Sequence, residues 1–250
     1  MRTLIVFFVL AVAASVCEAQ WVQTTLGSVD VGARLFSNEI TSPVHSVSFF
    51  DENRALACGG AGTILRTEDG GKSWVCETSG TNEWLSSVTI ASTDVAIVVG
   101  QRGIILRSKD GGRTWESRQS PTGEPLNSVF FANRTVGCAV GGNGAILRTT
   151  DCGDTWTPQT SGTTAMLTSV YLTSPDVGVV VGQNGIVLYT TNSGLTWISQ
   201  PSGTTSNLNG VYFTGWLEGI AVGNNGTILN TRRVGQPWIL QRSGTTHELF

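Results

Sequence analysis

The stretch Arg148-Thr149-Thr150-Asp151-Cys152-Gly153-Asp154-Thr155-Trp156 decides the fold, because four relatives of it recur along the chain. These relatives are RTEDGGKSW at 66–74, RSKDGGRTW at 107–115, YTTNSGLTW at 189–197 and NTRRVGQPW at 230–238. The tryptophans that end the five copies are spaced by 41 residues, without insertion or deletion: Trp74, Trp115, Trp156, Trp197 and Trp238. A gapless repeat of this length predicts a single body built from similar units.

Each unit carries the signals of four short strands. An apolar run rich in β-branched and aromatic residues comes first, with valine at a fixed position: Val47, Val88, Val129, Val170 and Val211. A second apolar run ends in glycine, a third strand follows a glycine turn, and a fourth begins at the tryptophan. Such units are typical of propeller blades. The sequence therefore predicts an all-β fold, a β-propeller with five full repeats at approximately 44–84, 85–125, 126–166, 167–207 and 208–248.

A segment near the N-terminus resembles part of a further blade. Trp21, followed by Gln23 and Gly27-Ser28, predicts a partial N-terminal strand equivalent to the fourth strand of a blade. We expect this strand to clasp the seam of a five-bladed ring, within a single propeller domain spanning 20–250. The alternative is an incomplete ring, which would be either a truncated gene product or a ring closed by another chain.

Composition and the N-terminus bear on partners and location. The chain has 250 residues, and its 15 basic and 18 acidic side chains give a net charge of -3, which argues against a general electrostatic grip on nucleic acid. Residues 1–19 predict a secretory signal peptide, since Arg2 precedes an apolar core at 4–14 and Cys17-Glu18-Ala19 is a small-x-small cleavage site. We expect an exported chain with no later membrane span, either extracellular or, in a photosynthetic host, in the thylakoid lumen.

The repeated stretch follows the pattern Ser/Thr-x-Asp-x-Gly-x-Ser/Thr-Trp, in which each residue has a structural purpose. The aspartate can accept hydrogen bonds within the turn, the glycine can take a positive φ, and the tryptophan can anchor the loop between blades. The last two copies depart from the pattern at Asn192, Arg233 and Pro237, so we expect looser loops there. We assign structural, non-catalytic roles to the remaining motif residues: Asp69, Trp74, Asp110, Trp115, Asp151, Trp156, Trp197 and Trp238.

With these motifs the chain resembles the Asp-box, or bacterial neuraminidase repeat, β-propellers. Its G-x-I-L-R-T-x-D-G-G-x-T-W units, over roughly 44–246, are most similar to the photosystem II assembly and stability factor family of lumenal propellers. The resemblance implies a non-catalytic scaffold in photosynthesis that binds a protein partner, such as a membrane-protein subunit. Asp boxes also occur in sialidases, sorting receptors and xyloglucan hydrolases. The alternative is therefore an extracellular carbohydrate-binding or sialidase-like glycosidase propeller.

The residues give little support to an enzyme. Sialidases need an arginine triad, an Arg-Ile-Pro stretch and a tyrosine–glutamate pair, whereas this chain has no Arg-Ile-Pro and places Tyr171 and Tyr212 at a repeated strand position. Carboxylates in the turns between first and second strands could form an acid–base pair, but nothing singles them out: Asp94, Asp176 and Glu218. His45 and His247 lack partners at metal-binding spacing. We predict no catalytic residue, no cofactor and no metal.

One polar feature repeats outside the needs of the turn motif. Arginine occupies the same third-strand position in three successive units, at Arg66, Arg107 and Arg148, and the second unit adds Arg102 and Arg113. One hypothesis is a protein-binding patch, since guanidinium groups suit planar contact with carboxylates and the resembling assembly factors are thought to use an arginine patch. The other hypothesis is that each arginine pairs with a neighbouring Asp-box or backbone oxygen.

The cysteines and glycosylation motifs complete the set of candidates. Four cysteines remain after removal of the signal peptide, at different repeat positions: Cys58, Cys76, Cys138 and Cys152. This scatter favours buried free thiols over a disulfide framework, although an exported chain could form disulfides. Two sequons, at Asn133 and Asn225, are candidate glycosylation sites in a eukaryotic host.

Overall fold

The computed structural model describes residues 42–214 and 218–250, which form five four-stranded antiparallel sheets. The first sheet is β1 (Val44–Phe49), β2 (Ala55–Gly59), β3 (Ile64–Thr67) and β4 (Val75–Glu77), and the second is β5 (Leu85–Ile90), β6 (Ala96–Gly100), β7 (Ile105–Ser108) and β8 (Glu116–Arg118). The third is β9 (Leu126–Phe131), β10 (Gly137–Gly141), β11 (Ile146–Thr149) and β12 (Thr157–Gln159). The fourth is β13 (Leu167–Leu172), β14 (Gly178–Gly182), β15 (Val187–Thr190) and β16 (Ile198–Gln200), and the fifth is β17 (Leu208–Thr214), β18 (Glu218–Gly223), β19 (Ile228–Thr231) and β20 (Ile239–Gln241).

A single 3-10 turn joins the second and third strands of every sheet. These turns are η1 (Gly60–Gly62), η2 (Gln101–Gly103), η3 (Gly142–Gly144), η4 (Gln183–Gly185) and η5 (Asn224–Gly226). None of the helices in the described part of the chain has the length and hydropathy that a membrane crossing requires.

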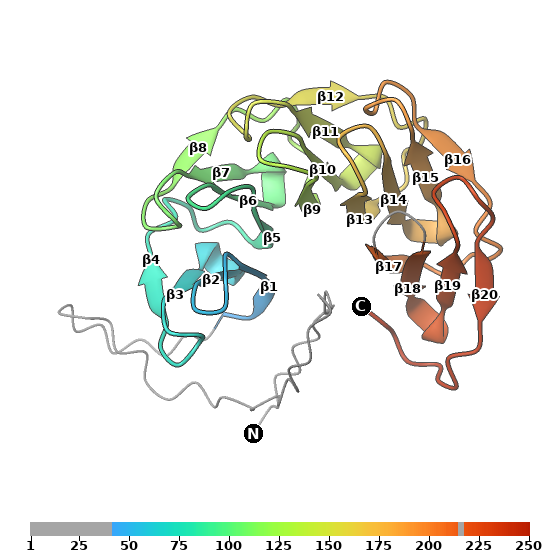
Figure 1. Ribbon diagram of the computed structural model, residues 1–250, viewed down its shortest axis with the longest axis horizontal. Coiled ribbons are helices and arrows are strands. Elements are labelled where there is room, and N and C mark those ends of the chain that lie inside the picture. Colours follow the sequence, from blue (N-terminus) through green and yellow to red (C-terminus); the bar gives the residue numbers. More distant parts are fainter. Residues whose placement is uncertain (1–41, 215–217) are drawn as a thin grey trace.

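The sheets are propeller blades arranged as an open arc (Figure 1), and we number them 1 to 5 in chain order. The first strands, β1, β5, β9, β13 and β17, are innermost, and each of the first four contacts the first strand of the next blade. The predicted all-β propeller with five full repeats is therefore confirmed.

The closed five-bladed ring that we expected is not formed by the described residues. Blades 1 and 5 lie at the two ends of the arc, which stays open between them (Figure 1). Trp21 and the rest of the predicted clasp lie outside the described residues, as does the predicted signal peptide at 1–19.

Packing between consecutive blades forms the core. We call the side of a blade that looks toward the next blade its forward face and the opposite side its back face. In blade 2, Ile97, Val99 and Ile105 of the forward face pack against the back face of blade 3, which includes Leu126 and Trp156. The same arrangement joins the other three pairs of neighbouring blades. Burial of one such large side chain stabilises the fold by roughly 1.5–3 kcal/mol.

A hydrogen bond from a backbone N–H to a serine hydroxyl accompanies this apolar packing at every blade junction. The backbone N–H of Val88 donates to Ser46 Oγ of the preceding blade at 3.2 Å. The equivalent bonds run from Val129 to Ser87, from Val170 to Ser128 and from Val211 to Ser169. The innermost strands belong to different sheets, so these hydroxyls satisfy N–H groups that no strand partner reaches.

The Asp-box loops are held by their own polar groups. The carboxylate of Asp69 accepts bonds from the Ser73 N–H at 2.9 Å, the Ser73 hydroxyl at 2.6 Å and the Thr67 hydroxyl at 2.8 Å. Asp110 and Asp151 make the same bonds. These residues therefore serve the turn, as the sequence predicts.

The expectation of a looser fourth loop is wrong. The Asn192 carbonyl oxygen accepts from the Thr196 N–H at 3.0 Å, and its amide donates to the Thr196 hydroxyl at 2.9 Å, so asparagine reproduces the aspartate bonds. The fifth loop differs, because Thr231 Oγ1 instead donates to the carbonyl oxygens of Arg233 and Gln236.

All four described cysteines are free thiols. Cys58 and Cys138 are buried in blade interfaces, Cys152 is half-buried and Cys76 is exposed on an outer strand. Burial raises the pKa of the Cys138 thiol to about 12, so this sulfur stays protonated and unreactive at neutral pH. The interpretation as buried free thiols fits Cys58 and Cys138 but not Cys76.

A matched pair of glycines tests the packing of the turns. Gly144 and Gly162 both have positive φ, at +67° and +75°, but a Cβ on Gly144 would lie 1.9 Å from the Thr163 carbonyl oxygen, whereas none of the surrounding atoms comes within 4 Å at Gly162. We predict that Gly162→Ala costs about 1 kcal/mol, from the left-handed backbone alone, and that Gly144→Ala costs at least about 3 kcal/mol. Urea denaturation measures both values, and equal losses would contradict the steric argument.

The Asp boxes make the stability of the fold depend on pH in the acidic range. Hydrogen bonds from the Ser73 hydroxyl and N–H, and from Thr67, lower the pKa of Asp69 from 3.8 to about 2. A lowered folded-state pKa contributes stability that is present above the unfolded value of 3.8 and is lost as the pH falls toward 2. We predict that thermal scans show the wild-type melting temperature dropping across this window, and that Asp69→Asn, which copies the native Asn192 loop, reduces the drop. Asp94→Asn, at an exposed position outside the Asp boxes, is the control for the loss of one surface carboxylate.

Candidate functional site

The two ends of the blades differ in their loops. The linkers between blades and the η turns share one end, where the Gln101 N–H donates to the Trp84 carbonyl at 2.8 Å and the Gly62 N–H to the Glu83 carbonyl at 2.8 Å. We call this end the linker face. The Asp boxes and the turns between first and second strands share the other end, where the Gly111 N–H bonds the Asp94 carbonyl at 2.8 Å. We call this end the box face.

An exposed aromatic and basic cluster lies on the linker face where blades 1 and 2 meet. The Trp84 side chain is 52% exposed, and its ring centroid lies 5.1 Å from that of His45. Arg102 in the adjacent turn is 82% exposed and approaches Glu83 at 3.3 Å. An apolar ring this open, beside donors and acceptors, is the kind of group that anchors protein partners.

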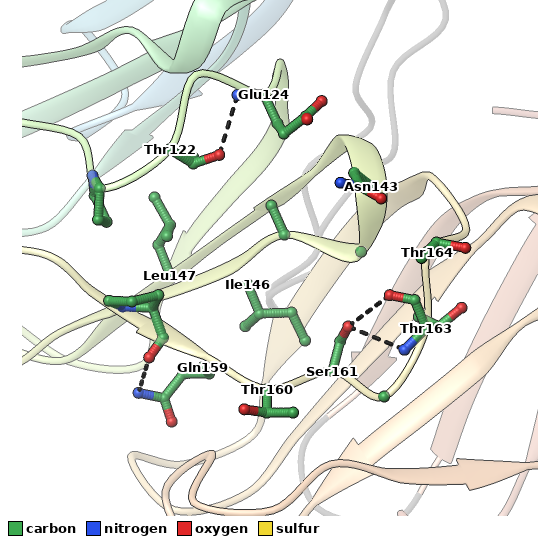
Figure 2. Close-up of a pocket in the computed structure, with 15 residues that line it drawn as sticks. Thr122, Glu124, Asn143, Ile146, Leu147, Gln159, Thr160, Ser161, Thr163 and Thr164 are labelled. Carbon is green, nitrogen blue, oxygen red and sulfur yellow. Dashed lines mark hydrogen bonds between the residues drawn. The ribbon is translucent and has the colours of Figure 1, made fainter.

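The linker face also carries an open depression of about 810 Å³ on blade 3 (Figure 2). One wall comes from the linker with Thr122 and Glu124, and the other from the linker with Ser161 and Thr163. Ile146 of β11 lies between these walls in Figure 2, and Gln159 of β12 lies beside Thr160 on the Ser161 side. The depression is thus a groove between two successive linkers.

Most hydroxyls of this groove already serve the linkers. Ser161 Oγ donates to the Thr163 carbonyl at 3.1 Å, and Thr122 Oγ1 accepts from the Glu124 N–H at 3.0 Å. Glu124 is the single carboxylate among the lining residues. Hydrolysis of a glycosidic bond generally requires two carboxyl groups on opposite sides of that bond, so these residues do not supply the usual pair.

The three repeated arginines lie in the interfaces between blades. The side chain of Arg107 is 9% exposed, and its Nε donates to the Cys152 carbonyl of the next blade at 2.8 Å. Arg148 similarly donates to the Pro175 carbonyl of blade 4 at 3.1 Å. These contacts are those expected if each arginine pairs with a neighbouring Asp-box or backbone oxygen.

Ion pairs link blades 1 and 2 on the box face. Arg66 bridges Glu77 and Glu68, at 2.7 Å each, and Glu68 also meets Arg113 of blade 2 at 2.5 Å. The Arg113 side chain is 55% exposed, and its Nη1 also donates to the Asp110 carbonyl at 3.0 Å. Of the five arginines in the predicted patch, Arg102 on the linker face and Arg113 on the box face are thus the two with largely exposed side chains.

Other predicted candidates are scattered. Asp94 and Asp176 lie in box-face turns of blades 2 and 4, and Glu218 is exposed at the start of β18. Asn133 and Asn225 are exposed, so the glycosylation prediction stays open at both. Across residues 42–214 and 218–250, His, Cys, Asp and Glu side chains form no group of three that could hold a metal ion.

Sequence reasoning missed Trp84. The other blades carry Pro43, Pro125, Met166 and Asn207 at its repeat position. A tryptophan that breaks the repeat, next to the buried Leu85, is a signal that a search for departures from the pattern would have found.

Comparison with known proteins places this geometry in a family. The sequence matches the family described as Photosynthesis system II assembly factor YCF48 at residues 36–109, 81–160 and 112–202, which together cover 167 of the 250 residues. No curated protein sequence matches the chain.

Several solved structures share the fold. "YCF48 bound to D1 peptide" is 18% identical with a TM-score of 0.58, over 80% of this chain and 81% of that one. An ancestral GH74 enzyme is 16% identical with a TM-score of 0.67, and the GH74 enzyme of Niastella koreensis is 17% identical with a TM-score of 0.64. The matches cover 82% and 80% of this chain but only 32% and 38% of the enzymes. With its repeats, its blades and this family match, the chain belongs to the photosynthesis system II assembly factor YCF48 family.

Proposed function

We propose that this protein is a non-catalytic scaffold that binds an exposed segment of a membrane-protein partner on its linker face. The observation that carries the proposal is the exposed Trp84 beside His45 and Arg102. Aromatic and arginine side chains dominate the binding energy of protein interfaces, because they combine a large apolar area with directional hydrogen bonds.

The proposed partner is a photosystem II reaction-centre polypeptide. Family membership supports this choice, as does the D1 peptide bound to the YCF48 structure of similar fold. The groove between the two linkers of blade 3 would receive an extended peptide that continues from Trp84, because its lining offers the exposed Pro121 and Pro158 and the Gln159 amide. Export to an extracellular or lumenal compartment is part of the proposal and rests on the sequence of residues 1–19.

A different role is proposed for the repeated arginines. Arg107 and Arg148 hold neighbouring blades together through backbone oxygens of the next blade, and Arg66 pairs with Glu77 of its own blade, so their contribution to binding is indirect. Arg113 remains a candidate for partner contact on the box face, since half of its side chain is exposed.

The test measures the binding of a D1 peptide to the purified protein by isothermal titration calorimetry. We predict that the double variant Trp84→Ala, Arg102→Gln weakens binding by at least about tenfold, the loss expected for one interface anchor. Its melting temperature should not change, because both side chains are largely exposed. Met166→Ala is the matched control, since Met166 occupies the Trp84 repeat position and is 38% exposed.

Two outcomes would overturn the proposal. If Arg66, Arg107 and Arg148 changed together to glutamine abolish binding without lowering the melting temperature, the interface arginines contact the partner directly. If the wild-type protein hydrolyses xyloglucan or a sialoside and ignores the peptide, the glycosidase alternative is correct.

A further inference from the structure

The outer edge of the blades changes in charge along the arc. Blades 1 to 3 carry side chains of both signs there, several of which form ion pairs, as Lys109 does with Glu116 at 3.5 Å and Arg118 with Asp154 at 3.2 Å. From residue 177 to residue 217 the sequence has no charged side chain. Among the described residues, none of the ion pairs involves blade 4 or blade 5, whose outer strands are β16 and β20 (Figure 1).

Strand register directs two aliphatic side chains toward the outer end of the junction between blades 4 and 5. Ile198 of β16 lies in the same row as Val179 of the forward face of blade 4, and Leu240 of β20 lies in the same row as Leu229 of the back face of blade 5. Ile198 is nevertheless 47% exposed and Leu240 is 60% exposed. The other junctions do not repeat this aliphatic pair, because their equivalent residues are Val75 and Ser117, Glu116 and Pro158, and Thr157 and Ser199.

Three arginines flank these aliphatic side chains on blade 5. Arg232 and Arg233 lie in the loop between β19 and β20 on the box face, and Arg242 directly follows β20 toward the linker face. All three are exposed, and no ion pair joins them to a carboxylate of the described residues. Arg233 replaces the aspartate of the Asp box, and Thr231 Oγ1 holds this loop through carbonyl oxygens instead. The turn therefore does not use the guanidinium group of Arg233.

The two carboxylates of blade 5 lie away from its outer edge. Glu218 begins β18, which lies two strands inward from β20. Glu248 belongs to the segment that returns to the inner edge, where the Leu249 N–H donates to the Gly223 carbonyl at 3.1 Å. The outer edge of blade 5 is thus a narrow strip with cations at both ends and exposed Leu240 between them.

We infer that the outer edge of blade 5 binds the surface of a membrane that contains anionic lipids. We call the residues concerned the basic edge: Ile198, Arg232, Arg233, Leu240 and Arg242. Guanidinium groups suit planar, bidentate contact with lipid phosphates. Exposed aliphatic side chains at the same level can enter the boundary between the headgroups and the acyl chains.

The shape of the basic edge favours a lipid surface over an acidic protein. A stable protein complex buries about 800 Å² on each partner, and one strand of three residues at the convex side of the arc offers far less than that (Figure 1). A fluid lipid surface needs no matching shape, so a few cations and aliphatic groups are enough for weak binding. We expect this binding to be reversible and to fall as the salt concentration rises, because it depends on the arginines.

The inference rests on the proposed function only for its setting, because a scaffold for a membrane-protein partner works beside a bilayer. The outer edge and the linker face are different sides of a blade. Contact of the basic edge with lipid therefore leaves Trp84 and the groove of blade 3 open to a peptide.

Co-sedimentation with vesicles tests the inference. Vesicles of phosphatidylglycerol and phosphatidylcholine in equal amounts are compared with vesicles of phosphatidylcholine alone. The full chain is compared with a version that lacks residues 1–19, so that binding by the apolar leader is recognised. We expect both versions to bind the anionic vesicles. The triple variant Arg232→Gln, Arg233→Gln, Arg242→Gln should bind them on the order of a hundredfold more weakly, since each cation near an anionic surface contributes about fivefold.

An equal loss of charge elsewhere is the matched control. The triple variant Lys72→Gln, Lys109→Gln, Arg134→Gln removes three exposed cations from blades 1 to 3 and should bind the anionic vesicles much like the wild type. Leu240→Ser should weaken the binding severalfold at unchanged net charge, because it removes an aliphatic group that enters the lipid. All of these variants should keep the wild-type melting temperature, since the altered side chains are exposed.

The inference is overturned if neither version of the chain binds the anionic vesicles, or if only the version with residues 1–19 binds them. It is also overturned if the control triple variant loses as much binding as the arginine variant. Full vesicle binding by Leu240→Ser, together with equal binding of the wild type to soluble polyglutamate, overturns it in favour of an acidic protein. Failure of the proposed function is distinguishable, because the double variant Trp84→Ala, Arg102→Gln should bind vesicles normally and the arginine variant should bind the D1 peptide normally.

Discussion

Packing of each aliphatic forward face on the back face of the next blade is the interaction on which the rest of this structure depends. A four-stranded sheet of such short strands buries too few apolar side chains to be stable alone, so every blade depends on the apolar face of its neighbour. The first forward-face position is Leu56, Ile97, Cys138 or Val179 in successive blades, and all four are buried. The volumes differ, so the opposing side chains must compensate for them, as cores do when total volume is kept. The serine bonds and interface arginines add direction to this contact.

The two ends of the blades differ in how many of their polar side chains are used by the fold. On the box face the polar groups are largely consumed by turns and ion pairs, as in the Asp69 loop and the Arg66–Glu68–Arg113 network. On the linker face the backbone turns are equally well bonded, yet Trp84 and Arg102 are left open to solvent. Side chains that the fold does not use are the ones available to a partner, which is why the proposed binding surface lies at that end.

The repeat predicted five blades and their strands because period and register are local properties of the chain. Closure could not be predicted, because the turn between blades arises from side-chain packing that no spacing records. Pairing of the arginines with Asp-box or backbone oxygens was one of two hypotheses from the sequence, but the specific partner could not be predicted, because Arg107 and Cys152 are neighbours only after two blades have packed. Trp84 could have been predicted as a candidate binding residue, because the other repeats carry no tryptophan at its position. The fourth loop was misjudged because an asparagine amide can both accept and donate where a carboxylate only accepts.

The open arc has a consequence for how the protein comes apart. Among the described residues, blades 2, 3 and 4 are each held by two neighbouring blades, whereas blade 5 is held by one. In a linear array of this kind, cooperativity passes only between adjacent units, and the end units fray before the middle opens. Backbone amides of blade 3 should then exchange with solvent most slowly, and those of β18 and β19 much faster. Unfolding of the described blades would spread inward from an end of the arc, as in a solenoid, because the contacts among residues 42–214 and 218–250 run only from one blade to the next.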